Sequence, residues 1–159
     1  MLGTTHILFA VLFGSIYVKY IGAPEGLLLQ IFFAATLILG AMLPDLDAKN
    51  STISKQHPMA SKAIRAFSDH RGIMHSVFIP AIIFLITYYV LPKLIDLPTE
   101  LFVGFLIGYA SHLASDVITI NGLELFHPFS SYRLRGFIRT GGKLELLVAS
   151  LIVVYLIIF

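Results

Sequence analysis

The chain contains no cysteine, and charged residues make up only 13% of its 159 positions. Without cysteine the protein has no disulfide, no thiolate metal site and no thiol nucleophile. The formal net charge of +2 is too small to predict a nucleic-acid partner. Apolar residues are abundant instead, at 57% of the chain with a mean hydropathy of +0.88, which is more than a soluble domain of this length carries. We therefore predict one membrane-embedded domain over residues 1–159.

Five apolar runs divide the chain, separated by short segments rich in glycine, proline and aspartate. They cover residues 7–20, 27–43, 73–91, 101–118 and 146–159. A membrane-spanning helix needs about 20 apolar residues, so the first and last runs are marginal. The first run also lacks the basic start and small-residue cleavage site of a signal peptide. These runs predict an all-α, polytopic membrane protein with about five helices.

Ionisable side chains gather at particular ends of the runs. They are His6 at the start of the first run, Asp45 and Asp47 at the end of the second, His70 and His75 before the third, and His112 and Asp116 at the end of the fourth. In a bundle of alternating spans, a start, an end, a start and an end all lie at the same membrane face. Ionisable residues inside membrane segments are costly, so their presence indicates a function.

The spacing within the second and fourth runs suits metal binding. His112 and Asp116 are four residues apart and therefore project from one helix face. Asp45 and Asp47 alternate with Leu46 after a proline. This alternation predicts an extended turn that points both carboxylates the same way.

His70 and His75 are five residues apart, which is about 140° around a helix, so both cannot bind one ion from a regular helix. Gly72 is expected to separate a His70 that precedes the helix from a His75 that opens it. The whole set offers four imidazoles and three carboxylates, enough for one or two divalent ions. Such mixed ligands favour a transition metal, with zinc first and manganese or iron as alternatives.

Positive charge is distributed unequally between the two ends of the predicted bundle. On the side of the ionisable cluster lie Lys49, Lys55, Lys62, Arg65, Arg71, Arg133, Arg135, Arg139 and Lys143. On the opposite side lie only Lys19 and Lys93. The positive-inside rule therefore predicts that the cluster faces the cytoplasm from the inner membrane.

Residues 58–67, "PMASKAIRAF", place apolar side chains at helical spacing with basic residues on the other face. They predict a short interfacial helix on anionic headgroups, with a soluble helix packed on the loop as the alternative. Membrane lipids are thus expected partners, and a homo-oligomer is compatible with the sequence.

Four arginines near the cluster suit a phosphate clamp, or alternatively determine topology. They are Arg71, Arg133, Arg135 and Arg139. Glu145 opens the fifth helix as a further ligand, a general base, or a carboxylate favoured by the helix dipole. His57 and His127 lie outside this geometry and are predicted to be ordinary loop residues.

Several of these segments together resemble one family of membrane proteins. They are "LPDLD" at 43–47, "HRGIMHS" at 70–76, "GYASHLASDVIT" at 108–119 and the histidine at position 6. The combination resembles the YdjM-type family of membrane-bound, metal-dependent hydrolases, from His6 to about Glu145. That family is distantly similar to zinc-dependent phospholipases C and P1-type nucleases, which implies a phosphoester substrate. The resemblance implies as metal ligands His6, Asp45, Asp47, His70, His75, His112 and Asp116.

These observations predict a membrane-bound hydrolase that cleaves a phosphoester of a membrane-associated lipid by two-metal activation of water. Asp45 or Asp47 would bridge the ions or act as base, and Arg71 with another arginine would neutralise the phosphate. The alternatives are a non-catalytic metal-binding protein or a transporter, although a transporter holds its ionisable residues near the bilayer midplane. A serine hydrolase built on Ser76 or Ser111 is a further alternative that no nucleophile elbow supports.

Overall fold

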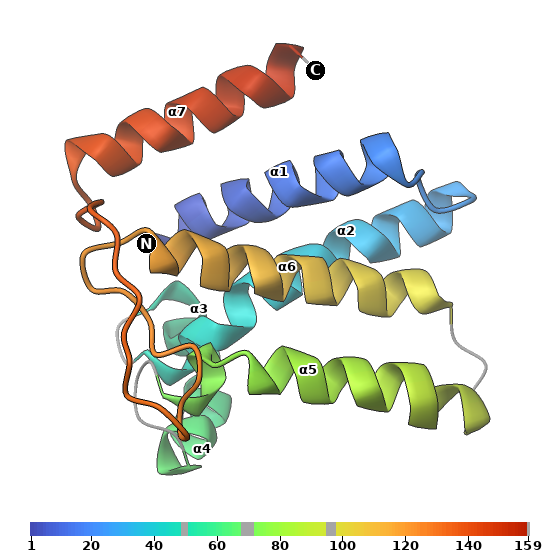
Figure 1. The fold of residues 1–159 in the computed structure, drawn as a ribbon. Helices are drawn as coiled ribbons and strands as arrows, with labels where there is room; N and C mark the ends of the chain where they lie inside the picture. The colour runs from blue at the N-terminus through green and yellow to red at the C-terminus, as the bar shows by residue number, and fades with distance from the viewer. Residues whose placement is uncertain (49–50, 68–71, 95–97, 159) are drawn as a thin grey trace.

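The computed structural model describes residues 1–48, 51–67, 72–94 and 98–158. Every regular element in those ranges is helical, as predicted, and the β pairing there is limited to two isolated bridges. The α-helices are α1 (Gly3–Tyr20), α2 (Leu27–Met42), α3 (Thr52–Gln56), α4 (Pro58–Phe67), α5 (Phe78–Leu85), α6 (Thr99–Val117) and α7 (Lys143–Ile158). Figure 1 shows α1, α2, α5, α6 and α7 running along one another, with α3, α4 and the loop before α7 gathered at one end.

The third apolar run is less regular than predicted. It begins with a 3-10 turn at Ile73–His75, continues as α5, and ends in a π-helical turn at Ile86–Val90 and a 3-10 turn at Leu91–Lys93. Two side chains bind carbonyls that a continuous helix would use. The Tyr109 hydroxyl donates to the Met74 carbonyl, and the Ser76 hydroxyl donates to the Ile73 carbonyl at 2.7 Å. These bonds hold the segment around His75 out of the helix.

The segment Leu43–Asp47 continues α2 as a 3-10 turn, with Pro44 at its start, where the missing N–H is not needed. The predicted extended turn is therefore wrong. A 3-10 helix has three residues per turn, so Asp45 and Asp47 project about 120° apart rather than together. Asp47 is buried and Asp45 is partly exposed.

Among the described residues, the stretch Leu27–Asp47 is long and apolar enough to cross a bilayer. Phe78–Lys93 is a shorter apolar stretch. Other helices also expose large apolar side chains, such as Leu151 and Ile157 of α7, which are 59% and 79% exposed. The number of spanning helices stays a prediction.

α2 and α6 form the central contact of the bundle, where glycines allow their backbones to touch. A Cβ atom added to Gly108 would lie 1.9 Å from the Leu37 carbonyl oxygen, and one added to Gly40 would lie 2.1 Å from that of Phe105. Small residues at helix interfaces permit this close approach in membrane proteins. α1 packs against both helices and α7 packs against α1.

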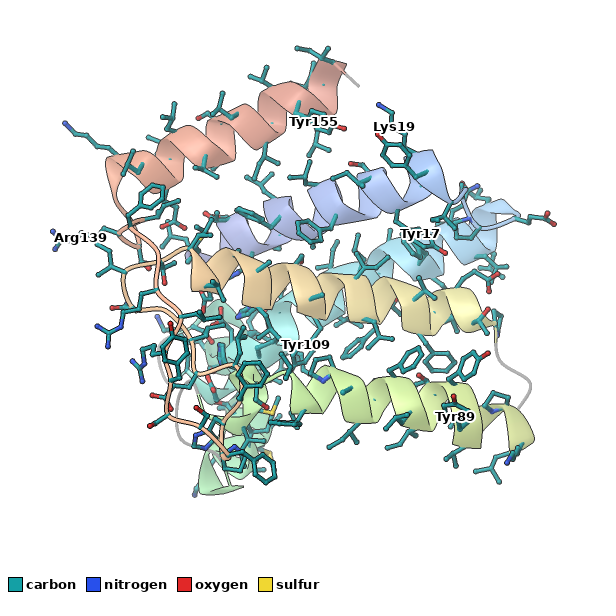
Figure 2. The ribbon with its side chains drawn as sticks, viewed as in Figure 1. Tyr17, Lys19, Tyr89, Tyr109, Arg139 and Tyr155 are labelled. Atoms are coloured by element: carbon teal, nitrogen blue, oxygen red, sulfur yellow. The ribbon has the colours of Figure 1, made fainter. Side chains whose placement is uncertain are left out.

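Two buried clusters line this contact. One contains Ala10, Phe33, Leu37 and Ala41, and lies along α1 and α2. The other contains Tyr109, Leu113 and Leu123, and lies toward the end where the loops gather. Figure 2 shows Tyr109 inside the bundle between α6 and α5. Packing of α6 therefore fixes its last two turns against α2 and the following loop.

Replacement of Gly108 by leucine should separate α2 from α6 and destabilise the protein. Overpacking of this kind costs about 1–3 kcal/mol or more, because the clash is with backbone that cannot move aside. Thermal unfolding in detergent should show a lower Tm for Gly108→Leu. The control is Ala110→Leu, at an exposed position of the same helix. Equal Tm values for the two variants would contradict the close contact.

Candidate metal centre

Five ionisable side chains from four segments meet at the end of the bundle near the N-terminus. They are His6 in the first turns of α1, Asp45 in the turn after α2, His75 in the turn before α5, and His112 and Asp116 in the last turns of α6. The start, end, start and end predicted to share one face do lie together. The prediction for His70 falls outside the described residues.

Asp116 lies at the centre of these side chains. Its Oδ2 atom is 3.9 Å from the Nε2 atoms of both His75 and His112, and its Oδ1 atom is 3.5 Å from His6 Nε2. The Nε2 atoms of His75 and His112 are 3.3 Å apart. All four side chains are at most 2% exposed, so water screens these contacts little.

The Nδ1 atoms of His75 and His112 are bound to groups outside this centre. His112 Nδ1 lies 2.6 Å from the Ala41 carbonyl oxygen, and His75 Nδ1 lies 3.1 Å from Asp47 Oδ2. A carbonyl or an ionised carboxylate only accepts hydrogen bonds. Both Nδ1 atoms therefore carry the proton, and in the neutral rings both Nε2 atoms present lone pairs.

The same reasoning applies to His6. The Ser115 hydroxyl donates to the His112 carbonyl at 2.8 Å, and its oxygen lies 2.7 Å from His6 Nδ1. Because a hydroxyl has a single proton, Ser115 accepts from His6 Nδ1. His6 Nε2 is then an acceptor, and it is a buried atom without a hydrogen-bond partner in the structure. The His6 and His112 rings stack with centroids 3.8 Å apart.

This arrangement fits a divalent transition metal. Lone pairs 3.3 Å apart on His75 and His112 repel each other unless a cation lies between them. A tetrahedral zinc ion with Zn–N bonds of about 2.0–2.1 Å holds two nitrogen ligands about 3.3–3.4 Å apart. Histidines that bind metals typically donate their second N–H to a carbonyl or a carboxylate, as His112 and His75 do.

The ligand atoms form two overlapping groups, each with its atoms within 4.8 Å of one another. One is His75, His112 and Asp116, and the other is His6, Asp45 and His112. His112 belongs to both, and its single free nitrogen, Nε2, can serve only one ion. The described residues therefore assemble donors for one ion, and a second would need a donor such as His70.

Three serines hold the turn that carries Asp45 and Asp47. Ser51 donates to the Asp45 carbonyl at 2.6 Å, and Ser61 donates to the Leu46 carbonyl at 2.7 Å. Ser54 lies between them, with its hydroxyl oxygen 3.0 Å from the Leu46 carbonyl oxygen, 2.9 Å from Ser51 Oγ and 3.0 Å from Ser61 Oγ. Sequence reasoning missed this serine cluster (Ser51, Ser54 and Ser61), although two of its members stand together in "STIS".

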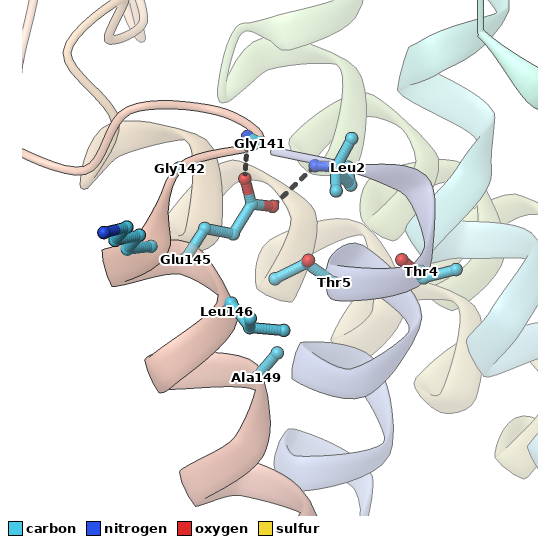
Figure 3. Close-up of a pocket in the computed structure, with 9 residues that line it drawn as sticks. Leu2, Thr4, Thr5, Gly141, Gly142, Glu145, Leu146 and Ala149 are labelled. Carbon is cyan, nitrogen blue, oxygen red and sulfur yellow. Dashed lines mark hydrogen bonds between the residues drawn. The ribbon is translucent and has the colours of Figure 1, made fainter.

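Glu145 makes contacts of a different kind from those of the histidines. Its Oε1 accepts from the Leu2 amide at 2.7 Å and its Oε2 accepts from the Gly141 amide at 2.6 Å, as Figure 3 shows. It therefore joins the starts of α1 and α7 beside a pocket of about 290 Å³. Its catalytic role stays a prediction. Beside it, the Met1 amino group donates to Asp116 Oδ1.

Three of the four arginines predicted to bind phosphate lie at the surface. Arg133, Arg135 and Arg139 are exposed, and Figure 2 shows Arg139 pointing outward at the loop end. Arg133 donates to Glu124 at 2.6 Å, and this bond lowers the pKa of the Glu124 carboxyl. Arg71 lies outside the described residues.

The two remaining histidines and the two candidate nucleophilic serines lie outside the ligand groups. His57 is exposed, and His127 lies 3.6 Å from Glu124 in the loop. The hydroxyls of Ser76 and Ser111 both donate to carbonyls three residues earlier, at 2.7 Å. Each hydroxyl proton is directed to a carbonyl rather than to a histidine, so these contacts do not support the serine hydrolase.

Removal of the Ser54 hydroxyl should loosen the turn and weaken metal binding. Ser54→Ala should lower the Tm, because the turn loses a buried hydroxyl that contacts the Leu46 carbonyl and the other two serines, and one lost hydrogen bond costs about 0.5–1.5 kcal/mol. Zinc affinity, measured by competition with a chelator, should fall about 10-fold, as for other residues that orient ligands. Ser54→Thr retains a hydroxyl and should recover part of the affinity. Ser150→Ala, on the exposed side of α7, is the control. Unchanged affinity in Ser54→Ala would contradict the positioning role.

Comparison with known proteins gives the family. The sequence pattern of the family described as "YdjM inner membrane protein" matches residues 1–159. The chain is 32% identical over 149 residues to YvsG, an uncharacterized protein of Bacillus subtilis (strain 168), covering 93% of this chain and 87% of that protein. It is 31% identical over 91 residues to the inner membrane protein YdjM of Escherichia coli (strain K12) and, equally, of Shigella flexneri, covering 57% of this chain and 46% of those proteins. No solved structure matches. The chain belongs to the YdjM inner membrane protein family.

Proposed function

We propose that this protein is a membrane-bound, metal-dependent hydrolase that cleaves a phosphoester of a membrane-associated lipid. The observation that carries the proposal is the convergence of three acceptor nitrogens, from His6, His75 and His112, on the Asp116 carboxylate. Family membership supports the membrane setting. The phosphoester is supported by the distant similarity to zinc phospholipases and by the basic surface around the site.

His75, His112 and Asp116 would hold the ion, with His6 and Asp45 beside them. Bound there, a divalent transition metal supplies Lewis acidity and makes water acidic enough to be a nucleophile near neutral pH. Nitrogen and oxygen donors are consistent with zinc, manganese or iron.

Asp45 is the residue best placed to move a proton. It is partly exposed, whereas the other residues of both ligand groups are buried. A carboxylate that reaches both the ligands and solvent can take a proton from the attacking water and pass it to the leaving group. Asp47 contributes by orienting His75, because it binds Nδ1 of that ring.

The basic residues around the site would neutralise the phosphate. Arg133 is already paired with Glu124, so we assign this task to Arg71 and to one of Arg135 and Arg139. The nine basic residues that the sequence predicts on the site's side favour a site that faces the cytoplasm. A lipid substrate would then present its headgroup at that surface.

The burial of the site favours a second candidate, a metal-binding membrane protein that catalyses nothing. His75 and His112 are 0% exposed and His6 is 1% exposed, which leaves little access for a substrate. Such a protein would store or carry the ion and would release no product.

The purified protein should contain about one transition-metal ion per chain, and His112→Ala should lose it. His112 belongs to both ligand groups, so its removal leaves neither complete. Elemental analysis of protein purified without chelators measures this directly. His127→Ala, in the loop before α7, should keep its metal. A wild type that binds zinc, manganese and iron no better than His112→Ala would refute the metal centre.

Metal binding and catalysis should separate in Arg71→Ala. Guanidinium offers no lone pair to a metal, so the variant should keep its ion. Its turnover of a phosphoester should fall about 10²-fold, if it stabilises transition-state charge. Asp45→Ala should lose activity as well and weaken metal binding.

The assay uses short-chain phospholipids and polyprenyl phosphates in detergent, with release of phosphate or headgroup as readout. Lys93→Ala, at the opposite end of the bundle, is the control. If the metal-loaded wild type releases nothing from any of these substrates, the hydrolase proposal fails and the non-catalytic role replaces it.

A further inference from the structure

The loop between α6 and α7 exposes an unusual amount of aromatic surface. The residues are Phe126 (49% exposed), Phe129 (83%), Tyr132 (67%) and Phe137 (74%), and we call them the aromatic loop residues. Contiguous exposed apolar side chains mark a surface that contacts a partner or a membrane. None of these residues contributes to the candidate metal centre.

The loop has a fixed frame that holds these side chains outward. Leu123 and Leu134 exchange two backbone hydrogen bonds of 2.9 Å, and Ile138 donates to the Ile118 carbonyl at 3.1 Å. Leu123 is 0% exposed and Ile138 is 3% exposed. The loop is therefore folded around its own buried side chains, and the aromatic rings are exposed because this backbone directs them outward.

The tip of the loop lies beside the first turn of α5. The Val77 amide donates to the Leu125 carbonyl at 2.9 Å, and the Phe129 ring meets the Phe78 ring edge-on at 5.2 Å. α5 is an apolar helix whose Ile82 and Leu85 are 50% and 52% exposed. If α5 enters the bilayer, as the sequence predicts, the loop tip lies level with that entry.

Basic residues accompany the aromatic ones on the outer face of the loop. Arg135, Phe137 and Arg139 occupy alternate positions and are exposed, while Ile138 between them faces inward. Figure 1 shows the loop at the same end as the amphipathic helix α4. Tyrosine concentrates at the membrane–water boundary, phenylalanine is typical of the apolar side of interfacial segments, and arginine is attracted to anionic headgroups there.

We propose that the aromatic loop residues, together with Arg135 and Arg139, sit in the headgroup layer of anionic phospholipids beside the metal centre. The geometry that supports this is the contact of the loop tip with α5 and the alternation of arginine and phenylalanine along its outer face. The proposal does not depend on catalysis, since a non-catalytic metal-binding protein would dock in the same way. It defines how deep the protein lies in the bilayer.

The chain contains no tryptophan, so a single substitution creates a unique fluorescent probe. Phe129→Trp and Phe137→Trp, each in the full chain, are reconstituted into phosphatidylcholine vesicles with or without phosphatidylglycerol. A second set of vesicles carries bromine on the acyl chains near the headgroups. Both probes should show blue-shifted emission and at least about 2-fold quenching by the brominated lipid, as aromatic rings at this boundary would. Leu151→Trp, on the exposed face of α7, is the reference for contact with lipid.

The role of the arginines is tested by reversing their charge. Phosphatidylglycerol in the vesicles should increase the quenching of Phe137→Trp by the brominated lipid. Arg135→Glu together with Arg139→Glu, placed in the Phe137→Trp background, should abolish this increase. Lys93→Glu, at the opposite end of the bundle, should leave it unchanged. Circular dichroism shows that each variant retains its helices.

Emission at the wavelength of a solvated indole, with no quenching at either position, would overturn the proposal and leave the aromatic surface to a protein partner. Quenching that is equal with and without phosphatidylglycerol would overturn the preference for anionic lipid. Neither result bears on metal content, so this test and that of the proposed function fail separately.

Discussion

The backbones of α2 and α6 approach so closely that no side chain fits at Gly40 or Gly108. This contact brings the Ala41 carbonyl to 2.6 Å from His112 Nδ1. Because a carbonyl only accepts, it fixes the proton on Nδ1 and leaves Nε2 as the atom that faces the centre. The packing of two apolar helices therefore determines which nitrogen is offered to a metal. Gly40 and Gly108 therefore influence the site indirectly, through the helix contact that they permit.

Much of this arrangement could be predicted from the sequence. Alternating helix direction is a topological constraint, so it placed His6 near Asp116 without any knowledge of packing, and the two lie 3.5 Å apart. The spacing of His112 and Asp116 follows from helix geometry alone. The direction of Asp45 and Asp47 was predicted wrongly, because it depends on hydroxyls that come from α3 and α4 rather than on the local alternation.

The groups that orient the histidines could not be predicted in the same way. Ala41 acts through its carbonyl, which every residue possesses, so no sequence signal marks it. Ser115 stands between His112 and Asp116 in the chain, and its position near their helix face could have suggested a role. Serine is so common at such positions that the suggestion is weak. Contacts through the backbone and through small hydroxyls become visible only once the helices are packed.

His6 Nε2 is a buried acceptor without a hydrogen-bond partner, and such an atom costs about 1–3 kcal/mol. In lipid, helices also lack a hydrophobic force between them and rely on packing and polar contacts. A cation held by His75, His112 and Asp116 would join the turn before α5 to α6. Its binding energy would then contribute to folding as well as to chemistry. The candidate ligands come from separate segments of the chain. An ion bound to them would therefore cross-link helix ends that the packing of the bundle brings together.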